Sequence, residues 1–381
     1  MISEHPTRLD RLMQVVAEHH PMHAELRLQF DDFHALLESN CEALIERLQV
    51  YFRHYAQHSD DVIAREYELR VVAIEAPEPD FGLEFEAWPA DPQRPGKSEQ
   101  FANVDGGRVV RQAGKGLQLL LGPDLTLAVG ACLRNSQQII NLINARYTER
   151  LLDAGWLLCH AAAVAWEGTG LALAGVSGSG KSTLALRLLR HGAQFVSNDR
   201  LLVRHVGRHT RMSGLPKLPR VNPGTLLGDP SLRALLSSER AHELSQLSEQ
   251  ALWELEDKHD VDIERVYGPG RIALMAWLRA LVVLTWSRES TSPTKVTRTT
   301  LGDSPHLISI IAKHPGPFYR GGAVRSGDDS VHALDPAPYF AALKHVPVVE
   351  ISGAVDFELV QRLCVELATA QPVHDHAAHE A

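Results

Sequence analysis

A short segment of the chain carries residues at the spacing of a phosphate-binding loop. Gly175, Gly180, Lys181 and Ser182 fit the pattern G-x-x-x-x-G-K-[ST]. In that pattern the loop amides surround the phosphates of a nucleotide, the lysine reaches the β and γ groups, and the serine hydroxyl binds Mg²⁺. The pattern therefore predicts a binding site for ATP and Mg²⁺, formed by nine consecutive residues: Gly175, Val176, Ser177, Gly178, Ser179, Gly180, Lys181, Ser182 and Thr183.

The residues on either side of this loop predict the elements that must position it. Residues 171–174 are apolar and predict a buried strand, and residues 181–189 carry leucines at helical spacing. A helix that begins at Lys181 directs its unpaired N–H groups and the positive end of its dipole toward a bound anion. The order strand, glycine loop, helix is thus the order that a phosphate site requires. An ordinary strand-to-helix turn is the alternative interpretation.

A phosphate loop also needs a carboxylate for the metal, and its place in the chain distinguishes the protein classes. Asp199 lies 18 residues after Lys181 and directly follows a short apolar run, residues 193–197, which predicts the next strand. Oxygen ligands suit Mg²⁺, so Ser182 and Asp199 are the predicted metal ligands. The chain has no N-K-x-D motif for guanine and no LSGGQ-type signature. GTPases and transporter ATPases are therefore disfavoured.

Five segments resemble the group formed by HPr kinase/phosphorylase and phosphoenolpyruvate carboxykinase, and most closely the set called HPr kinase-related kinase B. The segments are CHAAAV (159–164), GVSGSGKST (175–183), FVSNDR (195–200), GLPKLPRVNPGT (214–225) and YGPGRIALMAWLRALVVLTW (267–286). The resemblance extends over about residues 135–370. It implies a kinase that transfers a phosphoryl group from ATP to a hydroxyl of a protein or of a small molecule.

The resemblance also implies roles for individual residues. Lys181 and Asp199 are the expected phosphate and metal contacts, and His160 stands where the family keeps a histidine close to the site. Lys217 and Arg220, in a polar loop, are candidates to hold the γ-phosphate or the acceptor. The alternative interpretation of His160 is a buried core histidine, and that of Lys217 and Arg220 is ordinary surface charge.

One position departs from the family. HPr kinases have two consecutive aspartates where this chain has Asn198 and Asp199, and the first aspartate is usually assigned as the base that takes the proton of the acceptor hydroxyl. An amide cannot take a proton at any relevant pH. The base is then Asp260, Asp262 or His160, or the loose transition state of phosphoryl transfer needs none, or the chain has no kinase activity. The last alternative describes a nucleotide-binding regulator or assembly factor.

Composition limits the partners. The 381 residues carry a net charge of −9, and residues 1–100 alone hold 9 Lys and Arg against 20 Asp and Glu. The absence of a basic surface argues against a nucleic-acid partner. The sequence shows no apolar run of about 18 residues and no signal-peptide pattern, which argues against a membrane partner. Four widely spaced cysteines predict neither a disulfide framework nor a zinc site, so we expect a cytoplasmic protein, and we expect it to form a homo-oligomer.

The expected fold class is α/β, with a P-loop kinase core of the HPr kinase/PEP carboxykinase type at residues 135–370. This core has a mixed central sheet with flanking helices. A small acidic α+β module at residues 1–134 precedes it, and a disordered tail at residues 371–381 follows.

Periodicity predicts further elements along the chain. In the first module we expect a strand at 25–30, a helix with one apolar face from Phe33 to Phe52, and a meander between 109 and 133. Beyond it we expect helices or helical regions at 136–155, 231–255, 338–343 and 357–368, and strands at 281–286 and 348–351.

Overall fold

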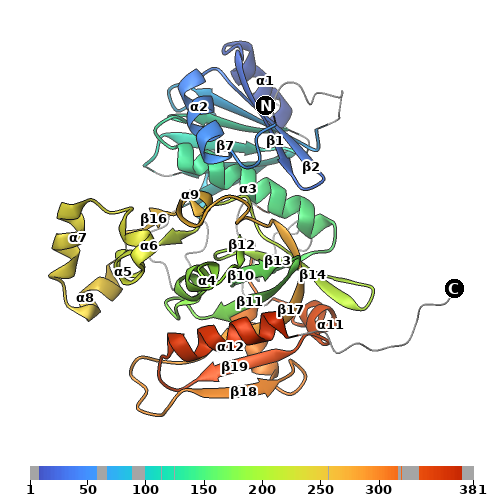
Figure 1. Cartoon of the computed structure of the whole chain (residues 1–381). Helices are drawn as coiled ribbons and strands as arrows, with labels where there is room; N and C mark the ends of the chain where they lie inside the picture. The colour runs from blue at the N-terminus through green and yellow to red at the C-terminus, as the bar shows by residue number, and fades with distance from the viewer. Residues whose placement is uncertain are drawn as a thin grey trace. The chain divides into compact units, whose positions relative to one another are not determined.

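The computed structural model describes residues 8–57, 67–87, 99–112, 114–123, 125–255, 257–315, 319 and 334–370. The predicted tail at 371–381 lies outside these ranges. The chain divides into two compact units, unit 1 (Met1–Gly155 with His314–Ala333) and unit 2 (Trp156–Lys313 with Leu334–Ala381). Both combine helices with β-sheets, so the fold is mixed α/β, as expected at this level (Figure 1).

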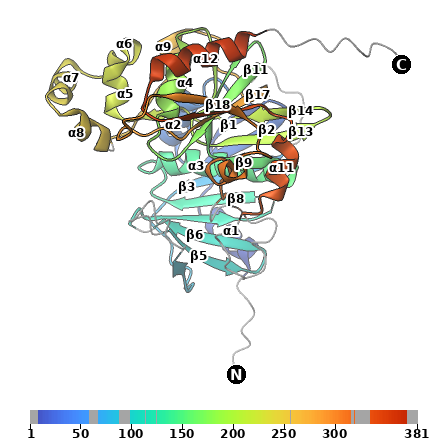
Figure 2. The ribbon, with the colours of Figure 1, turned by 90° about the horizontal axis from the view of Figure 1, so that it is seen from below.

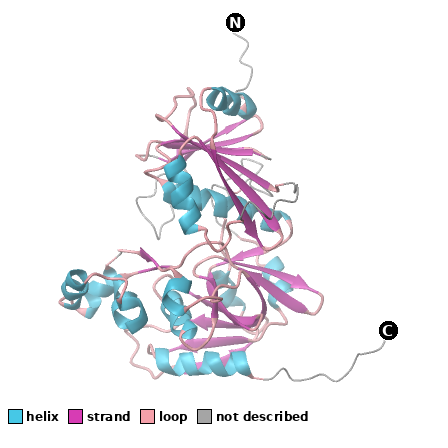
Figure 3. Cartoon of the chain, turned by 45° about the horizontal axis from the view of Figure 1, so that its top comes forward, coloured by secondary structure: helices cyan, strands magenta, loops and turns pink. Residues whose placement is uncertain are grey.

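Unit 1 is built on one eight-stranded sheet with the strand order β1-β2-β3-β8-β7-β6-β5-β4. Strands β2, β3 and β8 run parallel to one another, and all other neighbours are antiparallel (strands in magenta, Figure 3). Its elements are α1 (Leu9–Glu18), β1 (Ala24–Phe30), β2 (Phe33–Ser39), α2 (Glu42–Tyr51), β3 (Leu69–Glu75), β4 (Glu86–Ala87), β5 (Glu99–Val104), β6 (Gly107–Gln112), β7 (Leu117–Leu121), β8 (Leu125–Gly130) and α3 (Ser136–Asp153).

The predicted helix from Phe33 to Phe52 is wrong in its first half. Residues Phe33–Ser39 form β2, which pairs with β1 as a hairpin across a turn where Asp31 has a φ of 61°. The apolar residues of β2 are buried on both faces of the strand, so their pattern does not alternate. A short apolar run of this kind cannot be told from a buried helix by periodicity. Only residues Glu42–Tyr51 are helical.

Helix α3 belongs with unit 1, whereas the sequence placed a domain boundary at residue 134. The ring of Tyr147 lies 5.3 Å from that of Phe30 and 5.1 Å from that of Phe33, measured between centroids. Arg150 donates a hydrogen bond of 2.7 Å to the carbonyl oxygen of Glu68. These contacts hold α3 on the first sheet, and the structure therefore divides after Gly155.

Unit 2 is built on a nine-stranded mixed sheet whose main path is β12-β10-β11-β17-β14-β13-β9, with β19 beside β17 and β18 beside β19. Its elements are β9 (Leu157–Cys159), β10 (Ala161–Trp166), β11 (Thr169–Gly175), α4 (Lys181–Leu189), β12 (Gln194–Ser197), β13 (Leu201–Val206), β14 (His209–Ser213), β15 (Arg220–Val221), α5 (Pro223–Gly228), α6 (Pro230–Arg233), α7 (Ser238–Ser245), α8 (Glu249–Glu254), β16 (His259–Asp260), α9 (Ile263–Tyr267), β17 (Met275–Leu284), β18 (Lys295–Thr299), η2 (Pro305–Leu307), α10 (Ile308–Ile311), α11 (Ala337–Leu343), β19 (Val348–Ser352) and α12 (Phe357–Thr369).

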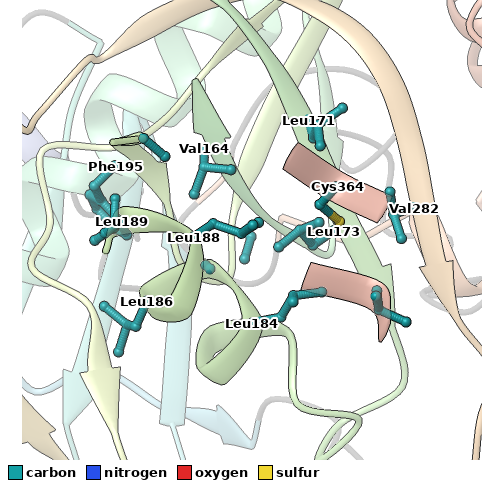
Figure 4. Packing of buried hydrophobic residues seen from close by; sticks show 14 of the residues in the cluster. Val164, Leu171, Leu173, Leu184, Leu186, Leu188, Leu189, Phe195, Val282 and Cys364 are labelled. Atoms are coloured by element: carbon teal, nitrogen blue, oxygen red, sulfur yellow. The ribbon is translucent and has the colours of Figure 1, made fainter. Parts of the chain in front are cut away.

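The central strands of this sheet are buried on both faces. Leu171 and Leu173 of β11 point into a cluster with α4 and α12, which also contains Cys364 (Figure 4). Ala172 and Ala174 of the same strand belong to a second cluster with α10 and α11. A strand covered on both faces is apolar throughout, which explains the run before the glycine loop. Each fully buried leucine side chain contributes about 1.5–3 kcal/mol to stability, so this packing fixes the strand end that carries the loop.

The region 231–255, predicted as helical, consists of three short helices instead of one long one. The residue before each helix caps it, because its side chain accepts a hydrogen bond from a backbone amide in the first turn. Asp229 accepts from the amide of Ser231 at the start of α6, Ser237 begins α7, and Ser248 begins α8. Together with α5 they form a helical segment inserted between β15 and β16, and the four helices lie together in both views (Figures 1 and 2).

The cysteines and the helices bear on the expected absence of disulfides and of membrane-spanning segments. All four cysteines are free thiols. Within the described ranges, no helix combines the length and the apolar character needed to span a bilayer.

Candidate functional site

Several strands of unit 2 end or begin at one edge of the nine-stranded sheet. Strands β11, β17 and β19 are parallel, and Gly175, Leu284 and Ile351 lie side by side at their carboxyl ends. Strand β10 is antiparallel to both β11 and β12, so β12 also ends at this edge and β10 begins there. The topology therefore places the glycine loop, the residues after Ser197 and the residue before Ala161 at one edge.

The glycine loop joins β11 to α4 in a conformation that requires glycine. Gly178 has a φ of 81° and Gly180 a φ of 89°, a region that other L-residues rarely adopt. A Cβ atom on Gly180 would lie 2.5 Å from Cζ of Phe357, at the start of α12. Trp286, just after β17, donates a hydrogen bond of 2.8 Å from Nε1 to the carbonyl oxygen of Ser179. The rings of Trp286 and Phe357 pack edge to face with centroids 5.1 Å apart, and together they hold the loop.

Lys181 begins α4 and folds back over this loop. Its side chain is buried, and Nζ donates to the carbonyl oxygens of Gly175 at 2.8 Å and Val176 at 3.0 Å. The hydroxyl oxygen of Ser179 is buried and has no hydrogen-bond partner among the described residues. A cradle that excludes Cβ atoms, a buried ammonium and an unsatisfied hydroxyl together suit an anion with several acceptor oxygens. The residues present thus fit a nucleotide phosphate group.

Asp199, directly after β12, is held by two side chains. His160 Nε2 lies 3.1 Å from Oδ1, and Lys313 Nζ lies 2.6 Å from Oδ2. Burial acts to raise the pKa of Asp199, but the hydrogen bond from His160 and the charge of Lys313 outweigh it and hold this pKa well below its usual value. The carboxylate is therefore ionised at neutral pH.

His160 contacts this carboxylate and lies near enough to Lys181 for that charge to act on its pKa. The hydrogen bond with Asp199 acts to raise the pKa of His160, but burial and the charges of Lys181 and Lys313 outweigh it, so the pKa lies below its ordinary value. A neutral imidazole that donates from Nε2 keeps a lone pair on Nδ1, an assignment made from the hydrogen-bond network. The family resemblance implied a histidine close to the site at this position, and the structure places His160 3.1 Å from Asp199 and within the influence of the Lys181 charge.

Lys217 lies in the same electrostatic environment, whereas Arg220 is turned toward a different partner. Burial, together with the charges of Arg200 and Arg220, lowers the pKa of Lys217 to about 8, although Asp199 and Asp260 act to raise it. Arg220 forms an ion pair with Asp260, its neighbour across β15 and β16, with Nε 3.1 Å from Oδ1.

Other candidates from the sequence have local structural roles. Asn198 directs Nδ2 toward the carbonyl oxygen of Arg220 at 3.4 Å, and its Oδ1 is buried without a partner among the described residues. Asp262 caps α9 by accepting from the amide of Arg265. The described residues include no group of three or more His, Cys, Asp and Glu side chains arranged to hold a metal ion by themselves.

Three residues of this site were not predicted from the sequence: Trp286, Phe357 and Lys313. The segment 267–286 was singled out without a role for its last residue, and Phe357 was predicted only as the start of a helix. No sequence pattern marks Lys313.

Substituting alanine for Gly180 is expected to destabilise unit 2 more than the same substitution at Gly192. Both glycines have φ near 90°, but a Cβ at Gly192 would meet only Trp166 Nε1, at 3.9 Å. Gly192→Ala should therefore cost about 1–2 kcal/mol for the left-handed backbone alone. Gly180→Ala should lose about a further 1–3 kcal/mol because the methyl group displaces Phe357. Denaturant unfolding measures both, and equal losses would show that Phe357 does not confine the loop.

Comparisons with known proteins give a similarity over part of the sequence. No protein-family model matches the chain. A stretch of 92 residues is 30% identical to HPr kinase/phosphorylase of Malacoplasma penetrans (strain HF-2), and it covers 24% of this chain and 30% of that protein. The match thus spans less than a third of the relative's length. The HPr(Ser) kinase/phosphatase of Coxiella burnetii superposes with a TM-score of 0.28 at 11% identity, over 54% of this chain and 92% of that chain. A score this low does not establish a shared fold. The chain is therefore similar to HPr kinase/phosphorylase over part of its sequence.

Proposed function

We propose that the chain is an ATP-dependent phosphotransferase of the HPr kinase-related type, with a P-loop core in unit 2. The observation that supports it most is the placement of the glycine loop, Lys181 and the ionised Asp199 at one edge of the sheet. The partial similarity to HPr kinase/phosphorylase, a protein named for kinase activity, favours the same class.

In this proposal ATP is the phosphoryl donor and binds through the glycine loop, residues Gly175–Thr183. The loop amides and Lys181 neutralise the phosphates, and Ser182 and Asp199 hold Mg²⁺. The metal would supply positive charge that offsets the charge developing on the transferred group. Catalysis then comes from positioning and charge neutralisation, as is general for phosphoryl transfer. Of the two loop cations we assign Lys217 to the γ-phosphate, because the charge of Asp199 acts on it whereas Arg220 forms an ion pair with Asp260.

Arg220 has a different role in this proposal. Its ion pair with Asp260 ties β15 to β16 at the base of the helical segment α5 to α8. We assign Arg220 to the acceptor, the second of the two roles that the resemblance implies for these cations. The acceptor is a hydroxyl of a protein or a small molecule, and we place the reaction in the cytoplasm with the chain as a homo-oligomer.

The second candidate function is a nucleotide-binding regulator or assembly factor, and Asn198 favours it. An amide stands where the family has its first aspartate. The two other candidate carboxylates already have partners, because Asp262 caps a helix and Asp260 pairs with Arg220. His160 remains a candidate base through Nδ1.

Incubation with ATP labelled at the γ-phosphate and a cell lysate separates the two functions. If the protein is a kinase, the unmodified protein transfers the label to an acceptor and Lys181→Ala does not. If it is a regulator, the unmodified protein binds ATP but transfers no label.

We expect the transfer to run forward only, without the phosphorolysis that gives HPr kinase/phosphorylases their second name. In the reverse direction inorganic phosphate would attack the phosphorylated acceptor, releasing pyrophosphate and returning a proton to the acceptor oxygen. One group must then serve as base in one direction and acid in the other. Asn198 cannot do so, and the loop LPKLPRVNPGT lacks the L-E-x-R-G-x-G pattern of the bifunctional enzymes.

The test of direction is to incubate phosphorylated acceptor with the protein, Mg²⁺ and phosphate, and to measure pyrophosphate. Release at a rate near the forward one contradicts the expectation. Asn198→Asp should leave the forward rate unchanged or raise it, because it restores a group able to exchange a proton.

A further inference from the structure

We propose that Lys313 sets the metal requirement of the nucleotide site: its ammonium occupies the Asp199 carboxylate, and a divalent cation binds there only by replacing it. This inference rests on the proposed function, which assigns Asp199 to the metal. It adds a residue that no sequence motif marks.

The contact occupies the oxygen atoms that a metal needs. Lys313 Nζ lies 2.6 Å from Oδ2 and His160 Nε2 lies 3.1 Å from Oδ1, so each carboxylate oxygen already has a donor. The side chain of Lys313 is 18% exposed, against 40% for Asp199. The Lys313 side chain is thus the more enclosed of the two, and the Asp199 side chain keeps more contact with solvent.

The backbone fixes Lys313 in this place. The amide of Lys313 donates to the carbonyl oxygen of Leu158 at 3.0 Å, and the amide of His160 donates to that of Ile311 at 2.7 Å. Between these bonds Cys159 and Ala312 form an antiparallel bridge. The end of α10 is therefore paired with the strand that leads to His160. The same short pairing places both donors of Asp199.

Charge repulsion prevents the Lys313 ammonium and a divalent metal ion from binding the Asp199 carboxylate at the same time. A metal bound to Asp199 would lie only a few ångströms from an ammonium on the same carboxylate, and like charges at such a distance repel strongly. Lys181 adds positive charge near His160, which contacts Asp199, and Lys217 lies near enough to Asp199 for the two charges to interact. A divalent ion alone should therefore bind weakly. The negative charge of a nucleotide's polyphosphate offsets the positive charge of the lysines and the metal ion, so metal and nucleotide should bind together.

The test is metal binding without nucleotide. Lys313→Met should bind Mg²⁺ about 10-fold or more tightly than the unmodified protein, by calorimetry and by the Mg²⁺-dependent rise in the unfolding midpoint. Lys313→Arg keeps the charge and should behave as the unmodified protein does. Lys344→Met, at the end of α11 and before the strand β19, is the matched control and should change nothing. Equal or weaker Mg²⁺ binding by Lys313→Met overturns the inference.

Two further variants keep the result interpretable. Lys313→Gln removes the charge but keeps a donor, and it replaces Lys313→Met if that variant does not fold. Adding Asp199→Asn to either variant should abolish the gain, and a gain that persists would place the metal elsewhere and overturn the inference. If the unmodified protein does not bind ATP at all, the proposed function fails. If it binds ATP with a Mg²⁺ dependence that Lys313→Met leaves unchanged, only the inference fails.

Discussion

Lys181→Ala should weaken the binding of Mg²⁺-ATP by about 10- to 150-fold. The reason is that a charge-assisted contact with the phosphates is worth about 1.5–3 kcal/mol, and Lys181 is the cation of the loop itself. In the structure its ammonium already lies against the carbonyl oxygens of Gly175 and Val176, within the loop that would hold the phosphates. Titration calorimetry of the two proteins with Mg²⁺-ATP gives the ratio of affinities.

The control for this prediction is the stability of the loop. The hydrogen bond from Trp286 to Ser179 does not involve Lys181, so the variant should keep the loop in place and unfold cooperatively. Lys344→Ala, at the end of α11, should bind Mg²⁺-ATP as the unmodified protein does. Equal affinities for the unmodified protein and Lys181→Ala would reject the assignment of the site.

Asp199→Asn should abolish the increase in ATP affinity that Mg²⁺ produces. The amide has the shape of the carboxylate but keeps only one acceptor oxygen, so it can accept from His160 or from Lys313 and not from both, and it carries no charge for the cation. Because Asp199 is 40% exposed, the lost ion pair should cost no more than about 1 kcal/mol of stability. ATP titrations with and without Mg²⁺ measure the effect.

Asp260→Asn is the matched control, because Asp260 also forms an ion pair, with Arg220 at 3.1 Å, but is not a proposed metal ligand. It should retain the full Mg²⁺ dependence. If Asp199→Asn gains as much from Mg²⁺ as the unmodified protein, the metal carboxylate is another residue.

The sequence predicted the parts of the candidate site that are local in the chain. The strand before Gly175, the left-handed glycines and the helix from Lys181 follow one another within 19 residues, 171–189, and each has its own local signature. Asp199 was found because it follows the next strand. His160 was found through a family resemblance, and the structure places it beside Asp199.

The parts that were missed depend on long-range packing. Lys313 meets Asp199 across 114 positions of the chain, and Trp286 meets Ser179 across 107. No local pattern reports such contacts. Strand β2 was predicted as a helix for a different reason: it lies between β1 and β3 with its apolar residues buried on both faces, so their spacing does not show the period of a strand. Local apolar spacing indicates that a segment is buried, but the partner decides between strand and helix.

The most direct test of the central claim is a crystal structure with Mg²⁺ and a non-hydrolysable ATP analogue. We predict that the polyphosphate lies against the amides of residues 178–182, that the metal lies between the Ser182 hydroxyl and the Asp199 carboxylate, and that Lys313 Nζ no longer contacts Asp199. A nucleotide bound away from the glycine loop would contradict the account.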